Sequence, residues 1–127
     1  MKRYRVYGIP RGKPRMTRSD KWKKRKCVVN YWEWCDAIRD AMGINEKIHL
    51  MMPVEVSITF WLPIPKSRKD LKPMDWHCQK PDKDNLEKGL LDAIFENDEF
   101  VCSSAKVEKK WTISSEAGAV FTIKYIN

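Results

Sequence analysis

Strict alternation of apolar and polar side chains constrains residues 54–61 more tightly than any other segment. The apolar positions are Val54, Val56, Ile58 and Phe60, and the polar positions between them are Glu55, Ser57 and Thr59. Because successive side chains of a β-strand point to opposite faces, this pattern predicts a strand with one face in the core. Pro63 and Pro65 follow and are expected to end it.

The rest of the chain divides into segments of helical and strand periodicity. In two segments apolar residues recur every three or four positions, which predicts two amphipathic helices. Gly43 is expected to end the first helix. Gly89, which costs about 1 kcal/mol relative to alanine inside a helix, is expected to mark close packing in the second. Alternating segments near the C-terminus predict a closing hairpin with its turn at 114–118. The expected elements are strands at 4–9, 54–61, 107–113 and 121–125 and helices at 27–42 and 84–94.

These elements fit one small α+β domain over residues 1–127, with a mixed sheet of about four strands and two main helices. No apolar run approaches the ~20 residues that a membrane-spanning helix needs. No apolar segment follows the basic N-terminal residues, as it would in a signal peptide. We therefore expect a soluble, cytoplasmic protein. Since no pair has C-x-x-C spacing, the cysteines are expected to be reduced thiols, mostly in the core: Cys27, Cys35, Cys78 and Cys102.

The positive charge of the chain is concentrated in one segment, residues 11–26. This segment holds nine of the 25 basic residues and a single acid, Asp20, so it alone accounts for the net charge of +8. Such concentration suits a polyanion, and nucleic acid is the first candidate; a solvated arm is the alternative interpretation. The residues expected to contact DNA are Lys13, Arg15, Arg18, Lys21, Lys23, Lys24 and Arg25.

A second basic segment, residues 63–81, contains four prolines and shows little periodicity. A structureless loop of this length in so small a domain is usually functional or mobile. Its five cations favour contact with phosphates.

Two aspartates and a lysine form the densest chemical pattern. Asp82 and Asp84 are two residues apart, and Lys88 follows Asp84 by four. In an extended segment, residues two apart point the same way, so both carboxylates can face one cation. Mg²⁺ binds a few carboxylates and keeps waters that a phosphate can replace, and a lysine beside it can stabilise charge on that phosphate. In the alternative interpretation Asp84 caps the helix, Lys88 pairs with Asp84 or Asp92, and Asp82 is a turn residue.

The sequence around these residues resembles the core motif of the RusA Holliday-junction resolvases. The likeness covers residues 80–88, Lys-Pro-Asp-Lys-Asp-Asn-Leu-Glu-Lys, and residues 90–94, Leu-Leu-Asp-Ala-Ile. His77 and the segment 12–18 are similar to phage and prophage members of that family. The order of the expected elements also suits a RusA-like fold.

The resemblance implies a homodimeric endodeoxyribonuclease that cleaves four-way DNA junctions with Mg²⁺ or Mn²⁺ in recombination and repair. Asp82 and Asp84 match the paired metal-binding aspartates, and Lys88 matches the catalytic lysine. The metal would activate a water for hydrolysis of the phosphodiester, and a two-fold dimer would present two identical sites to two symmetric strands. A phage, prophage or bacterial source, and hence a bacterial cell, is also implied.

The third acidic ligand is less fully matched. Asp98 is the assignment, although Asn97 replaces the first residue of the family's usual Asp-Asp pair and the preceding segment is shorter. Glu96 or Glu99 is the alternative ligand. By the same resemblance, His77 and Lys80 are expected to contact phosphate or to support the ligands.

Two other interpretations remain open. Pro81-Asp82 followed by Glu108 and Lys110 matches the PD…(D/E)-x-K pattern of restriction-type endonucleases, for which Lys110 rather than Lys88 would be essential. The chain could also be a non-catalytic or degenerate branched-DNA-binding module, because basic loops and six tryptophans suffice for phosphate contact and base stacking. Such a module would bind DNA in EDTA and cut no strand.

Overall fold

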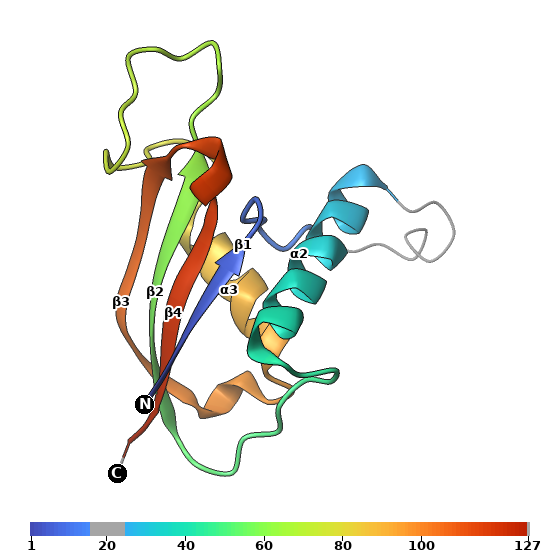
Figure 1. The fold of residues 1–127 in the computed structure, drawn as a ribbon. Helices are drawn as coiled ribbons and strands as arrows, with labels where there is room; N and C mark the ends of the chain where they lie inside the picture. The colour runs from blue at the N-terminus through green and yellow to red at the C-terminus, as the bar shows by residue number, and fades with distance from the viewer. Residues whose placement is uncertain (16–24, 127) are drawn as a thin grey trace.

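The computed structural model describes residues 1–15 and 25–126, arranged as Figure 1 shows. In chain order the elements are β1 (Lys2–Tyr7), α2 (Lys26–Met42), β2 (Val54–Pro63), α3 (Lys83–Ile94), η1 (Asp98–Phe100), β3 (Val101–Thr112), η2 (Ser114–Glu116) and β4 (Gly118–Tyr125). The strands form one sheet in the order β1-β4-β2-β3, and both helices lie on the same side of it (Figure 1). The fold is the small α+β class with a mixed sheet that the sequence predicts.

The core lies between the sheet and the two helices. Alternate residues of β2 are buried from Val54 to Leu62, which confirms the strand predicted from the alternating segment. They belong to one cluster with Ile38 of α2 and Leu90 of α3. The strand therefore has one buried and one open face, as its two-residue period requires.

The order of the strands differs from the prediction in one respect. β2 and β3 pair in parallel, joined through α3, while β4 pairs antiparallel with the other edge of β2 and with β1. The predicted hairpin between the last two strands is therefore wrong, because β2 lies between them. Alternation predicts that a segment is a strand but carries no information about which strand lies beside it.

The ends of the helices are close to those expected. Gly43 follows α2 with φ of 72°, the left-handed conformation that ends helices, and its amide donates to the last turn. α3 begins at Lys83, so that Asp82 and not Asp84 is the N-cap, and no side-chain capping bond is made. Asp84 instead lies in the first turn, where a negative charge is favourable.

The segment 63–81 is more ordered than a structureless loop. Residues 74–77 run antiparallel along the outer edge of β3. The amide of Met74 donates to the carbonyl of Trp111 at 3.0 Å, and the amide of His77 donates to that of Lys109 at 3.1 Å. This pairing covers an edge that would otherwise present free backbone groups.

The expectation for the cysteines is wrong in part. All four are free thiols, but only Cys35 is buried, and Cys27, Cys78 and Cys102 are exposed.

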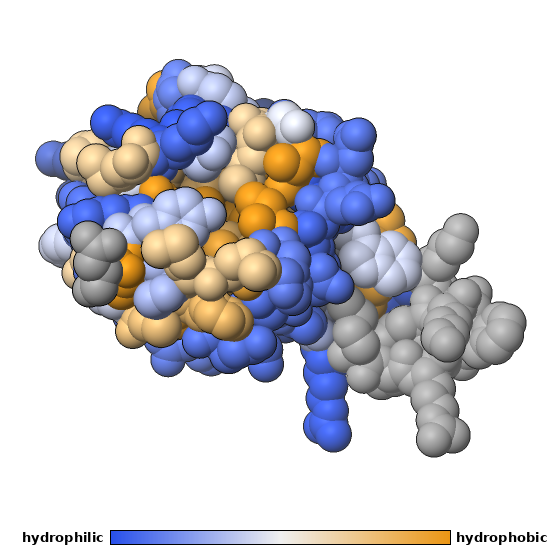
Figure 2. Space-filling view, turned by 90° about the horizontal axis from the view of Figure 1, so that it is seen from below, coloured by the Kyte–Doolittle hydropathy of each residue, from blue (hydrophilic) through white to orange (hydrophobic). Residues whose placement is uncertain are grey.

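Apolar side chains also reach the surface, Met51 and Met52 among them. Figure 2 shows the lower end of the molecule, where apolar and polar side chains are interspersed. Within the described ranges, no helix has the length and apolarity to cross a membrane.

Candidate active site

A hollow of about 360 Å³ opens between α3, η1 and β3. Its wall consists of Asp84, Glu87, Lys88, Leu91, Asp98, Val101 and Ser104. The four residues from α3 share one face of the helix, since residues three and four apart are neighbours there. Of the acids implied by the resemblance, the structure thus brings Asp84 and Asp98 together beside Lys88.

Asn97 fixes the turn that carries Asp98. Its side chain is buried, with Oδ1 accepting from the amide of Leu50 at 2.7 Å and Nδ2 donating to the carbonyl of Leu50 at 2.8 Å. An amide can make both bonds at once, whereas an ionised carboxylate has no proton to donate. The departure from the Asp-Asp pair therefore has a structural role, and the carboxylate of the hollow is that of the next residue.

Three of the candidate acids lie outside the wall of the hollow. The carboxylate of Asp82 lies 2.8 Å from the ammonium of Lys80, which holds the pKa of Asp82 below its usual value. The chain is extended at residue 82 and helical from residue 83, so Asp82 and Asp84 do not project like alternate residues of a strand. Oε2 of Glu96 lies 3.7 Å from Nδ1 of His49, and Glu99 does not line the hollow.

Glu87 is a residue of the hollow that the sequence interpretation missed. Its carboxylate accepts a hydrogen bond from the hydroxyl of Ser104 on β3. The bond ties the helix to the strand inside the hollow. A third acid three residues after Asp84 was the available signal, because that spacing places both on one helical face.

Lys109 is a second residue that the sequence interpretation missed. It fixes the backbone of residues 79–81, which lead into α3. Its ammonium donates to the carbonyl of Gln79 and, at 2.8 Å, to that of Pro81, on either side of Lys80. Burial lowers the pKa of Lys109. A charged residue on the same side of the strand as Val107 and Trp111 was the sequence signal that it had an internal role.

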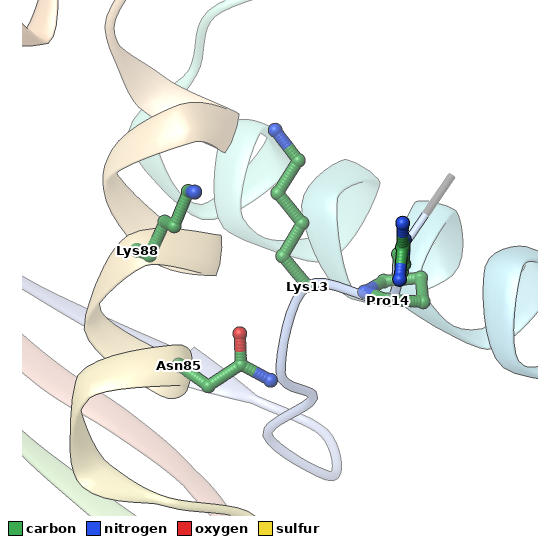
Figure 3. Close-up of a pocket in the computed structure, with 5 residues that line it drawn as sticks. Lys13, Pro14, Asn85 and Lys88 are labelled. Carbon is green, nitrogen blue, oxygen red and sulfur yellow. The ribbon is translucent and has the colours of Figure 1, made fainter. Parts of the chain in front are cut away.

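A second hollow, of about 430 Å³, lies on the other side of Lys88. It is lined by Lys13, Pro14 and Arg15 of the N-terminal segment and by Asn85 and Lys88 of α3. Figure 3 shows Asn85 and Lys88 projecting from α3 towards the segment that carries Lys13 and Pro14. Lys88 thus stands between a group of carboxylates and a group of cations.

Close packing on α3 holds the N-terminal segment in this place. A Cβ at Gly89 would lie 3.1 Å from the ring of Tyr31 and 3.2 Å from the carbonyl oxygen of Arg11 and the amide nitrogen of Lys13. The hydroxyl of Tyr31 donates to the carbonyl of Gly89 at 2.8 Å. The expectation that Gly89 marks close packing is confirmed.

The remaining residues predicted to contact DNA are placed differently. Arg25 donates to the carbonyl of Arg15 at 2.7 Å, which joins the two described ends of the basic segment. His77 is buried against Trp111, with ring centroids 4.2 Å apart, and burial lowers its pKa, so it does not offer a charged group at the surface. Lys80 is exposed. Arg18, Lys21, Lys23 and Lys24 lie outside the described residues.

The residues of the PD…(D/E)-x-K pattern do not come together. Glu108 and Lys110 line a hollow on the open face of the sheet, whereas Asp82 lies at the start of α3 on the helical side. Glu108 lies 3.2 Å from Lys106 and 4.0 Å from Lys110. The geometry therefore favours the grouping around Lys88.

The carboxylates that line the hollow beside α3 are oxygen donors, the kind of ligand that a hard cation takes. Within residues 1–15 and 25–126, no three His, Cys, Asp or Glu side chains are grouped so that they could hold a metal by themselves. Mg²⁺, however, is usually held by one or two carboxylates together with waters and substrate phosphates. The oxygen donors of Asp84 and Asp98 fit that kind of site.

A family model described as Endodeoxyribonuclease RusA matches residues 7–121 of the chain. The matched range contains the two hollows on either side of Lys88 and every element that forms them. No curated protein matches the sequence.

Proposed function

Since the chain belongs to the RusA endodeoxyribonuclease family, whose members are nucleases that act on DNA junctions, we propose that it resolves four-way junctions by Mg²⁺-dependent cleavage. Mn²⁺ is the alternative ion. The proposal includes a homodimer and paired, symmetric nicks, in the service of DNA recombination and repair. A junction with near two-fold symmetry suits a two-fold dimer, which presents the same site to two equivalent strands.

One observation supports this function above the others: the position of Lys88 between two hollows of opposite character. Asp84 and Asp98 line the hollow on one side of it, and Lys13 and Arg15 line the hollow on the other. A phosphodiester backbone passing over Lys88 would meet a cation site and a phosphate-binding site in succession. Hydrolysis of a phosphodiester needs both, because the metal must lie beside a phosphate that is held still.

The residues take the following roles in the proposed mechanism. A bound Mg²⁺ would supply a water of lowered pKa and would polarise the scissile phosphate. Asp84 and Asp98 would hold the ion, and Asp82 at the N-cap would be the third carboxylate, although in this structure it pairs with Lys80. Lys88 stabilises the negative charge that develops on the phosphate or on the leaving oxygen.

The N-terminal cations hold the substrate rather than the metal. Lys13 and Arg15 would bind the phosphate next to the scissile one. Lys13 also lies 2.6 Å from Asp92 on α3, so its position is set before DNA arrives. A contact fixed in advance favours correct placement of the strand.

A series of carboxylate variants tests the proposal. We expect Asp84→Asn and Asp98→Asn to lower Mg²⁺-dependent cutting of a four-way junction about a hundredfold or more while junction binding in EDTA is retained. Glu99→Gln, next to Asp98 but outside the hollow, is the matched control. Full cutting by both aspartate variants, or loss of cutting by the control alone, would contradict the assignment. A wild-type protein that binds junctions and cuts none would be a binding module.

A further inference from the structure

The face of the sheet turned away from α2 and α3 carries a hollow that the proposed cleavage does not use. This hollow has a volume of about 500 Å³ and is lined by residues of all four strands and by Met74. No described helix covers this face (Figure 1). The residues proposed to cut DNA lie between α3 and β3 on the opposite side of the sheet, so this hollow has no part in the proposed cleavage.

Two tryptophans and a lysine form a row across this face. Trp61 of β2 pairs in register with Lys110 of β3, and Lys110 pairs with Trp76 on the added edge segment. Neighbouring strands are about 4.8 Å apart, so the two indoles are separated by roughly 10 Å, with the lysine between them. Paired residues of neighbouring strands point to the same face, so all three side chains share one surface.

The indole of Trp76 is held but not buried. The ammonium of Lys110 lies 4.7 Å from its ring centroid, and backbone bonds between residues 74–77 and β3 fix its Cα. The residue is nevertheless 60% exposed. A large, fixed and exposed aromatic side chain is typical of a binding surface rather than of a core.

The charge of the hollow is positive. Its lining contains three cations, Arg3, Lys106 and Lys110, and one carboxylate, Glu108. Glu108 lies between the two lysines, within 4.0 Å of each, so its charge is balanced. The net charge complements a polyanion, whereas two-fold pairing of this face with a second copy would place like charges together.

We propose that the row Trp61–Lys110–Trp76 is a stacking platform for unpaired bases of a DNA single strand, with Lys106 and Arg3 on its phosphates. Bases expose their flat faces only when they are unpaired, and aromatic side chains on an open sheet are a general means of binding them. The platform extends the proposed function: it would bind unpaired DNA on the side of the sheet opposite the cutting hollow.

The test is the affinity for a short, labelled oligodeoxythymidine, measured by fluorescence anisotropy in EDTA. Raised salt weakens the purely electrostatic contribution of the N-terminal basic segment. Trp76→Ala is expected to weaken binding about tenfold, and Trp76→Phe to retain most of it, because a smaller ring still stacks. Trp32→Ala is the matched control, since Trp32 is 43% exposed on α2, away from this face, and is expected to bind as the wild type does.

Three results would overturn the platform. The first is unchanged binding of the oligonucleotide by Trp76→Ala, and the second is an equal loss in Trp76→Ala and Trp32→Ala. The third is a change from dimer to monomer in the sedimentation of Trp76→Ala, which would make this face an interface between copies of the chain. None of these results depends on cleavage, so the platform and the proposed nuclease activity can fail independently.

Discussion

The ammonium of Lys13 lies 2.6 Å from the carboxylate of Asp92, joining two residues 79 positions apart in the chain. Both side chains are only partly exposed. The pair fastens the N-terminal basic segment to the helix that carries Asp84 and Lys88. The residues proposed to bind the substrate and those proposed to cut it therefore meet on one face of α3.

The N-terminal basic segment packs directly on Gly89 of α3, and a substitution there tests this packing. Gly89→Ala should lower the free energy of unfolding by about 1–2 kcal/mol, although alanine is the better helix former by about 1 kcal/mol. The new Cβ would meet backbone atoms of Arg11 and Lys13, which cannot yield as a flexible side chain can. Urea unfolding measures the change. A gain in stability would show that the segment is not packed on Gly89.

Lys109 fixes residues 79–81, the segment that leads into α3, through two hydrogen bonds. Lys109→Met keeps the length of the side chain but loses the bonds to Gln79 and Pro81, so the amide of His77, which is bonded to the carbonyl of residue 109 just before this segment, should exchange its hydrogen faster. We also expect the Mg²⁺ concentration for half-maximal cutting to rise, with partial recovery in Lys109→Arg. Lys124→Met, on exposed β4 surface, is the control. Unchanged exchange in Lys109→Met would refute this role.

The third prediction distinguishes the two nuclease patterns. Lys88→Ala should lower the rate of junction cutting about a hundredfold, because the ammonium stabilises charge that develops during the reaction. Glu108→Gln should cut as the wild type does, because Glu108 faces away from α3. Initial rates under single-turnover conditions measure both. The opposite pattern of losses would favour the PD…(D/E)-x-K interpretation.

The fourth prediction concerns pH. Burial, and then the charge of Lys109, lower the pKa of His77 from 6.5, so the unfolded chain binds a proton more readily than the folded one. The contribution of neutral His77 to the free energy of unfolding should be fully present above pH 6.5. It should be lost as the pH drops below 6.5 towards the pKa of His77 in the folded protein. Urea unfolding between pH 5 and 8 measures the slope, which His77→Phe should reduce. An equal slope in that variant would exclude His77 as its cause.

Features of the fold that depend on neighbours in the chain could be predicted from the sequence. The periodicity around Ile38 and Leu90 located both helices, and the alternation of Val54 to Phe60 located the central strand. The neighbours of each strand could not be predicted, because β4 has the same alternation whether it lies beside β3 or β2. Pairing depends on contacts that no local pattern encodes.

The same limit applies to the candidate site. Helical spacing predicted that Lys88 would lie beside Asp84, and the structure places both in one hollow. Asp82 was expected to join them, but the chain changes from extended to helical between the two aspartates. Lys109 was missed because its partners, at 79 and 81, lie about 30 residues earlier and meet it only across the sheet edge.

Cleavage of a synthetic four-way junction whose four strands are labelled separately, beside a linear duplex, decides whether the chain resolves junctions. The wild-type protein is incubated with Mg²⁺ or with EDTA, and the nicks are mapped on each strand. We predict nicks at symmetric positions in two opposing strands of the junction, none in the duplex, and none in EDTA. Tight junction binding without cutting in either Mg²⁺ or Mn²⁺ would contradict the proposed metal-dependent resolution, as would cutting that persists in EDTA.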